Sequence, residues 1–110
     1  MEEKTYKLRW TKNAKDDLID IVTRIKQENP NTAMEIYQKL RKRAQSSNFF
    51  PLKGRVVPEL LDEGITYYRE LIEKPWRVIY RVGDETVYLI AIIDSRQNLD
   101  ELLLKKILSK

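Results

Sequence analysis

The sequence contains neither cysteine nor histidine, and these two absences remove several classes of chemistry. Disulfide bonds, thiolate nucleophiles, histidine general bases and the usual zinc sites all require one of these residues. Hydrophobic runs are also short, because the longest, Val87–Ile93, is far below the roughly 20 residues that span a bilayer. We therefore expect a soluble, cytoplasmic chain without a membrane segment, in which any chemistry would use Arg, Lys, Tyr, Glu or Asp.

The length and the net charge of the chain limit the number of domains and the kinds of partner. A chain of 110 residues with 42% hydrophobic side chains has enough material for one core, so residues 1–110 are expected to form a single domain. The net charge of +4 is uneven, because residues 1–50 hold 11 basic and 7 acidic side chains whereas residues 51–110 hold 10 of each. Such an excess suits nucleic acid and an acidic protein equally well.

Three β-rich runs occupy residues 66–94. They are Thr66–Ile72, Trp76–Val82 and Thr86–Asp94, and short segments containing Pro75 and Gly83 separate them. Two tight turns between three strands predict an antiparallel meander. The last run is almost continuously apolar, which is typical of a strand covered on both faces, and we expect it to be the middle of the sheet.

The side chains of the second run alternate between two faces. Apolar and aromatic residues share one face, whereas the other mixes arginine with isoleucine and is expected to stay partly open. The two sets are Trp76, Val78, Tyr80 and Val82, and Arg77, Ile79 and Arg81.

Residues 6–46 predict a short strand followed by a helical hairpin. Tyr6, Leu8 and Trp10 alternate with basic residues, as in a half-buried strand that joins one side of the meander. Thr11 is a suitable N-cap, and Asn29-Pro30 ends one helix and begins the next. Apolar stripes then recur at helical spacing: Ala14, Leu18, Ile21, Val22 and Ile25 in the first helix, and Ala33, Ile36, Tyr37, Leu40 and Ala44 in the second. Asp16, Asp17 and Asp20 suit the positive end of the first helix dipole.

The remaining segments complete an α+β fold of the order β-α-α-β-β-β-α. Residues 48–64 lose periodicity and predict a long loop, packed through apolar residues and pinned to the sheet by Phe49-Phe50-Pro51. After the meander, Asn98 is a good N-cap for a short C-terminal helix that contains Leu99, Leu102, Leu103 and Ile107.

Carboxylate pairs at helical spacing do not add up to a metal site. Asp16 with Asp20, and Glu59 with Glu63, lack a third ligand and are more simply polar surface. The sequence also has no Gly-rich phosphate loop, so we expect no metal and no cofactor.

A basic and aromatic constellation on the predicted sheet is the strongest candidate for a site. It consists of Arg69, Arg77, Arg81 and Arg96 with Tyr67, Tyr68, Trp76 and Tyr80 interleaved. Such a surface can hold phosphates and stack bases, or it can bind the carboxylates of a partner peptide. Cross-strand ion pairs of these arginines with Glu70, Glu73 and Glu85 are the structural alternative.

In the order and spacing of its motifs, the chain resembles the RelE/ParE toxins of bacterial type II toxin–antitoxin modules, especially the ParE (plasmid stabilisation) branch. The resemblance covers residues 6 to about 98. It is carried by Trp10-Thr11, Ala14, Asp17-Leu18, Ile21, Asn29-Pro30, Ala33, Phe50-Pro51, Gly54-Arg55, Pro58-Glu59-Leu60, Arg69-Glu70-Leu71, the run Trp76–Val82 and Ser95-Arg96.

The resemblance implies one of two activities. RelE-like members are ribosome-dependent, metal-independent endoribonucleases that use Lys, Arg and often Tyr, whereas ParE-like members are described as inhibitors of DNA gyrase. Arg77 matches the sheet arginine of the nucleases, and Arg96 could supply a second cation. Their lysine positions hold Tyr68 and Glu70 here, and Gln97 and Leu103 align with their later arginine and tyrosine. The last strand is followed by Asp94-Ser95-Arg96-Gln97 instead of a His-Gly-Arg-Arg-like stretch.

This comparison favours a ParE-like toxin that acts by binding gyrase and is neutralised by an acidic antitoxin. A RelE-like messenger-RNA nuclease and a small basic nucleic-acid-binding module are the alternatives. We expect the antitoxin to contact the sheet through Arg69, Trp76, Arg77, Tyr80 and Arg81. The expected target-binding residues are Lys39, Arg41, Lys42, Arg43 and Arg96.

Overall fold

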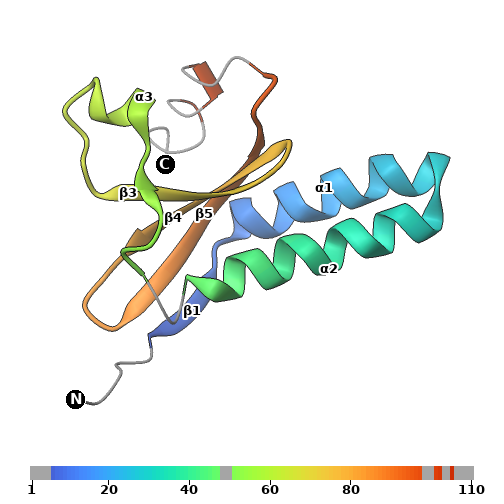
Figure 1. Ribbon diagram of the computed structural model, residues 1–110, viewed down its shortest axis with the longest axis horizontal. Coiled ribbons are helices and arrows are strands. Elements are labelled where there is room, and N and C mark those ends of the chain that lie inside the picture. Colours follow the sequence, from blue (N-terminus) through green and yellow to red (C-terminus); the bar gives the residue numbers. More distant parts are fainter. Residues whose placement is uncertain (1–5, 48–50, 98–100, 103–104, 106–110) are drawn as a thin grey trace.

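Two long helices and a five-stranded sheet form the framework of the computed structural model, which describes residues 6–47, 51–97, 101, 102 and 105 (Figure 1). The sheet order is β1-β5-β4-β3-β2, with β1 parallel to β5 and all other neighbours antiparallel. The elements are β1 (Lys7–Trp10), α1 (Lys12–Glu28), α2 (Pro30–Ser46), β2 (Arg55–Val56), α3 (Pro58–Leu61), β3 (Tyr68–Glu73), β4 (Trp76–Val82) and β5 (Thr86–Asp94). The predicted α+β class, the meander and the N-terminal strand at its side are confirmed.

The last strand is buried on both faces, as its sequence predicts. Val87 and residues 89–93 are all buried, and β1 and β4 flank the strand. The prediction that β5 is the middle strand is wrong, however. β4 has that place, because the short β2 adds a fifth strand beyond β3.

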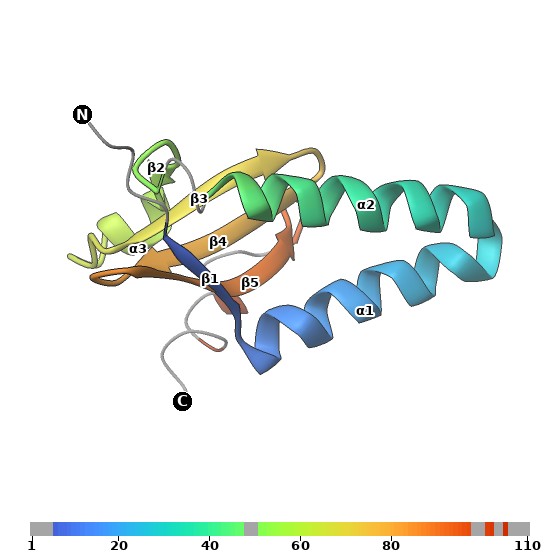
Figure 2. The same cartoon turned by 90° about the horizontal axis from the view of Figure 1, so that it is seen from below.

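The helical hairpin begins and turns where its capping residues predict. The Thr11 hydroxyl accepts a hydrogen bond from the Ala14 N–H at 3.2 Å, and Asn29 ends α1 and caps α2 with Pro30 in its first turn. Figure 2 shows α1 and α2 side by side, with part of the hairpin against the sheet and the turn between the two helices projecting beyond the sheet. The stripe facing the sheet includes the buried Ala14, Leu18, Leu40 and Ala44.

Polar residues of α1 take over the edge of β5 where β1 ends. The register with β1 stops at Trp10 and Leu89, and a register shift follows at Ile79/Tyr80 in the β4–β5 pairing. Beyond that point the Asn13 side chain donates to the Ile90 carbonyl at 2.8 Å, and the Ile92 N–H donates to Asp17 Oδ2 at 3.0 Å. The first turn of α1, where a negative charge would interact best with the helix dipole, contains no acidic residue. Asp17 lies beyond that turn and instead accepts a hydrogen bond from a strand N–H that would otherwise lack a partner.

The second face of the sheet is covered more fully than the alternation in β4 predicts. Val57 and Leu60, at the start of α3 and within it, pack against Ile79, Ile90, Ala91 and Ile93 in a separate apolar cluster. Arg77 is also buried on this face, and only Arg81 of the three residues is exposed. The expected open face is therefore limited to the end of β4.

The loop before β3 and the C-terminal segment differ in part from their predictions. The loop before β3 is packed, but it contains β2 and α3, and Leu52 and Leu61 are exposed. Phe49 and Phe50 lie outside the described residues, as does most of the predicted C-terminal helix. Within that segment Glu101 and Leu102 are helical, and Leu102 packs against the second apolar cluster.

Candidate functional site

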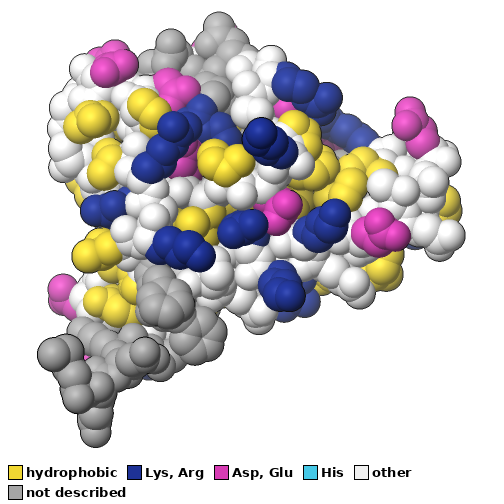
Figure 3. Space-filling model, in the orientation of Figure 1, with side chains coloured by type: hydrophobic (Ala, Val, Ile, Leu, Met, Phe, Trp, Pro, Cys, Tyr) yellow, Lys and Arg dark blue, Asp and Glu magenta, His cyan; other side chains and the backbone are white. Residues whose placement is uncertain are grey.

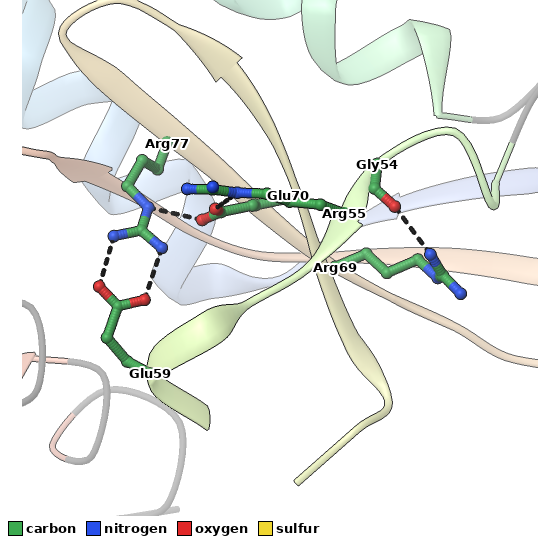
Figure 4. A network of polar contacts seen from close by, with 6 residues as sticks. All are labelled: Gly54, Arg55, Glu59, Arg69, Glu70 and Arg77. Carbon is green, nitrogen blue, oxygen red and sulfur yellow. Dashed lines mark hydrogen bonds and ion pairs between the residues drawn. The ribbon is translucent and has the colours of Figure 1, made fainter. Parts of the chain in front are cut away.

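Arg77, the arginine that matches the sheet arginine of the nucleases, is enclosed by two carboxylates. Its side chain is 5% exposed, and Nη1 and Nη2 each donate to Glu59 at 2.7 Å. Nε donates to Glu70 Oε1 at 2.5 Å. Figure 4 shows Glu59 reaching the guanidinium from α3 while Glu70 lies between Arg77 and Arg55. Arg55 contributes a further ion pair to Glu70 at 2.5 Å.

The charges of this network reinforce one another. Hydrogen bonds from the Arg77 guanidinium hold the pKa of Glu59 below its ordinary value, more than offsetting the effect of burial. The same hydrogen bonds raise the pKa of Arg77, so both groups remain charged at neutral pH. An anion that approached Arg77 would first have to displace a carboxylate.

Tyr80 and Arg69 hold the segment before β2. The Tyr80 hydroxyl, fully buried, donates to the Pro51 carbonyl at 2.7 Å and accepts from the Gly54 N–H at 3.0 Å. Arg69 Nη1 donates to the Gly54 carbonyl at 2.8 Å. Figure 4 shows Arg69 directed toward Gly54 and away from Arg77. Three of the five residues expected to bind the antitoxin, Arg69, Arg77 and Tyr80, are therefore held by hydrogen bonds or ion pairs within the chain.

Two residues of the constellation, Tyr68 and Arg81, belong to a row that crosses four strands. Tyr68, Arg81, Tyr88 and Arg9 are successive register neighbours on β3, β4, β5 and β1. The two arginines are exposed, and the Arg81 guanidinium lies 5.4 Å from the Tyr88 ring centroid. Burial raises the pKa of Tyr68. The row alternates cations and aromatic rings, as the sequence predicts for this sheet, but Arg9 and Tyr88 were not expected in it.

The basic residues of α2 point in two directions. Arg41 lies over the Tyr37 ring at 5.6 Å and lines a cleft of about 270 Å³ between the helices, together with Trp10, Lys15, Leu18 and Ile19. Lys39, Lys42 and Arg43 lie on another side of the helix, where Arg43 Nε is 3.4 Å from Glu73 Oε1. The expected target-binding cluster is therefore divided by the helix.

Arg96 and Trp76 lie apart from the α2 cations. Both line a cleft of about 430 Å³ with Asp17, Ile21 and Ile92 among its other walls. Arg96 is exposed and donates to Asp94 at 2.6 and 2.9 Å, and this contact holds the pKa of Asp94 below its usual range.

The described part of the chain contains no group of three or more His, Cys, Asp or Glu side chains placed to hold a metal ion. None of its helices is long and apolar enough to cross a membrane.

Comparison with known proteins assigns this chain to a family. The family model of the ParE toxin of type II toxin–antitoxin systems, parDE, matches residues 8–99. The chain belongs to this ParE toxin family. No curated protein matches the sequence.

Two solved structures have the same fold as this ParE-family protein. A chain of the chromosomal ParDE system from P. aeruginosa has a TM-score of 0.68 at 20% identity, covering 82% of this chain and 96% of that chain. A chain of the toxin–antitoxin complex RelBE2 from Mycobacterium tuberculosis has a TM-score of 0.59 at 21% identity, covering 84% of this chain and 94% of that chain. The predicted RelE/ParE-like fold is confirmed.

Sequence reasoning did not find two members of the ion-pair network around Arg77 in this ParE-family protein, namely Glu59, which binds Arg77, and Arg55, which binds Glu70. Glu59 was considered for its spacing to Glu63 and as part of the family resemblance, and Arg55 only as part of that resemblance. The available signal was the helix start at Pro58-Glu59, which places an acidic side chain in the first turn of α3. The structural alternative, in which Glu70 pairs with a sheet arginine, is confirmed by its ion pair with Arg77.

Proposed function

We propose that this ParE-family protein arrests growth by binding DNA gyrase and that a cognate antitoxin neutralises it. The enclosure of Arg77 supports binding over RNA cleavage. A metal-independent nuclease needs cations free to stabilise the charge that develops on the phosphate. Here the matching arginine is held by Glu59 and Glu70, and Arg96 is held by Asp94. A buried carboxylate at Glu70 would repel the charge that such an enzyme must stabilise.

Parallel assays of the purified protein test this proposal. We expect inhibition of gyrase supercoiling, and no codon-positioned cuts when primer extension is performed on translated messenger RNA. Toxin premixed with antitoxin is the control and is expected to leave supercoiling intact. Codon-positioned cuts that disappear in Arg96→Ala would show the RelE-like activity instead. Arg96 suits this test because it is exposed, so its loss should leave the fold intact.

The antitoxin is proposed to be an acidic segment that folds on binding and covers two surfaces of the toxin. One is the row of Tyr68, Arg81, Tyr88 and Arg9 across the sheet, in which both arginines are exposed. The other is the cleft between the helices, where Ile19 is 63% exposed and Lys15 and Arg41 flank the apolar wall. An amphipathic segment can insert apolar side chains there and place carboxylates beside the cations.

Charge reversal on both surfaces is expected to weaken antitoxin binding. The double variant Arg41→Glu with Arg81→Glu should raise the Kd at least tenfold, or about 1.4 kcal/mol, because each change opposes an acidic partner. Isothermal titration calorimetry measures this effect, and the loss should shrink as salt is added. Lys26→Glu with Lys53→Glu is the control, since it makes the same charge change at exposed residues that line neither surface. Equal affinities for the two double variants would contradict this placement.

A further inference from the structure

Three cations of α2 meet the β3–β4 hairpin in a cleft of about 300 Å³. Lys39, Lys42, Arg43 and Ser46 line it from the helix, and Glu73 lines it from the end of β3. The helix spacing of three, four and seven residues puts the four α2 side chains on one face. Figure 3 shows one face of the molecule, and Lys and Arg side chains gather near the centre of this face.

The positive charges of this cleft are incompletely neutralised. Lys39 and Lys42 are exposed, and neither has an ion-pair or hydrogen-bond partner within the described residues. Arg43 is 37% exposed and makes one long contact of 3.4 Å to Glu73, instead of a bidentate pair. Among the described residues of the cleft, three cations therefore face one carboxylate, and the cleft can accept a further anion.

The chemistry of the walls distinguishes between two kinds of anionic partner. Protein interfaces bury an apolar centre, whereas protein–DNA interfaces are more polar and more positively charged. Among the described residues that line this cleft there is no apolar side chain, in contrast to the cleft between the helices, which contains Trp10, Leu18 and Ile19. Lysine point charges beside an arginine fork are the groups that commonly contact backbone phosphates.

We propose that this cleft binds a backbone phosphate of duplex DNA, with Lys39, Lys42 and Arg43 as its cationic contacts. The inference rests on the proposed function, because a DNA-bound enzyme would present such phosphates to the toxin. Glu73 competes with the phosphate for Arg43. Its carboxylate must lose this ion pair when DNA binds, so it limits the affinity while it keeps Arg43 directed into the cleft.

Fluorescence anisotropy with a short labelled DNA duplex tests the site on the toxin alone. Wild type is expected to bind with a marked salt dependence. Lys39→Glu with Lys42→Glu should weaken binding at least tenfold at low salt and reduce the log–log salt slope by about 0.9, the contribution of the single phosphate held in the cleft. The control, Lys26→Glu with Lys53→Glu, has the same net charge and should lose much less affinity. Glu73→Gln should bind DNA more tightly than wild type.

Several outcomes would overturn the site. They are no DNA binding by wild type at low salt, equal losses in the two double variants, or no gain in Glu73→Gln. Binding of a poly-glutamate peptide in place of DNA, with the same dependence on Lys39 and Lys42, would assign the cleft to an acidic protein. Thermal unfolding of each variant verifies that the fold is retained.

The supercoiling assay separates this inference from the proposed function. If wild type inhibits gyrase but DNA binding does not depend on the cleft, the cleft assignment fails and the function stands. If DNA binding depends on the cleft but supercoiling is unaffected, the gyrase proposal fails and the cleft assignment stands.

Discussion

Replacing Arg77 with methionine is expected to lower the free energy of unfolding by about 3–5 kcal/mol, because it leaves buried negative charge without its partner. The Glu70 side chain is fully buried and would keep only Arg55, which is 60% exposed. Glu59 would lose both of its bonds to the guanidinium. A loss of this size is a large share of the 5–15 kcal/mol that typically stabilises a domain. Urea unfolding monitored by circular dichroism measures it.

Arg81→Met provides a matched control in the same strand. Arg81 is exposed and loses only its contact with the Tyr88 ring, so about 0.5–1 kcal/mol is expected. Adding Glu70→Leu to Arg77→Met should recover much of the loss, since the unpaired buried carboxylate is then absent. Equal stability of Arg77→Met and Arg81→Met would show that the network contributes little.

Acid should narrow the difference between wild type and Arg77→Met. The folded pKa of Glu59 lies below its ordinary value of 4.5, so its ion pair adds stability that is complete above that value. This contribution is lost as the pH falls through the folded pKa. Unfolding of both proteins at pH 7 and at progressively lower pH follows the change. A constant difference would contradict the role of the Glu59 ion pair.

Gly54→Ala is expected to lower the free energy of unfolding by about 2–5 kcal/mol. A Cβ at this position would lie 2.5 Å from the Glu70 carbonyl oxygen and 2.5 Å from the Tyr80 hydroxyl. The neighbouring backbone belongs to the sheet and cannot move without breaking the β2–β3 pairing. Displacing the hydroxyl would also leave the Gly54 N–H and the Pro51 carbonyl, both in buried residues, without their partner. Thermal and urea unfolding measure the loss.

Gly83→Ala is the control, because its added Cβ would meet neighbours only at 3.3 Å, where small shifts can relieve the contact. Tyr80→Phe separates the two causes of the Gly54 effect. It removes the hydroxyl but leaves the clash with the Glu70 carbonyl, so Gly54→Ala should remain destabilising in that background. A cost near that of Gly83→Ala would indicate that the segment before β2 adjusts freely.

Local patterns in the sequence determined most of the framework. Thr11, Asn29 and Pro30 act on backbone groups within four residues of themselves, so the helix ends could be predicted. The strands β4 and β5 begin and end as expected because alternation and turn residues are also local signals. The short β2 and α3 were missed, since two and four residues are too few to show a period.

The accessibility of the candidate site, in contrast, was decided only by the tertiary structure. Alternation puts Arg77 and Arg81 on one face of β4, and by this measure the two are equivalent. They differ because α3 covers one of them and supplies Glu59 from 18 residues earlier in the chain. Likewise the four basic residues of α2 lie within five residues of one another, and helical spacing separates Arg41 from the other three, but only the tertiary structure shows that those three meet the hairpin. Which charges are neutralised and which remain available thus depends on contacts between segments that are distant in sequence, and local patterns carry no information about these contacts.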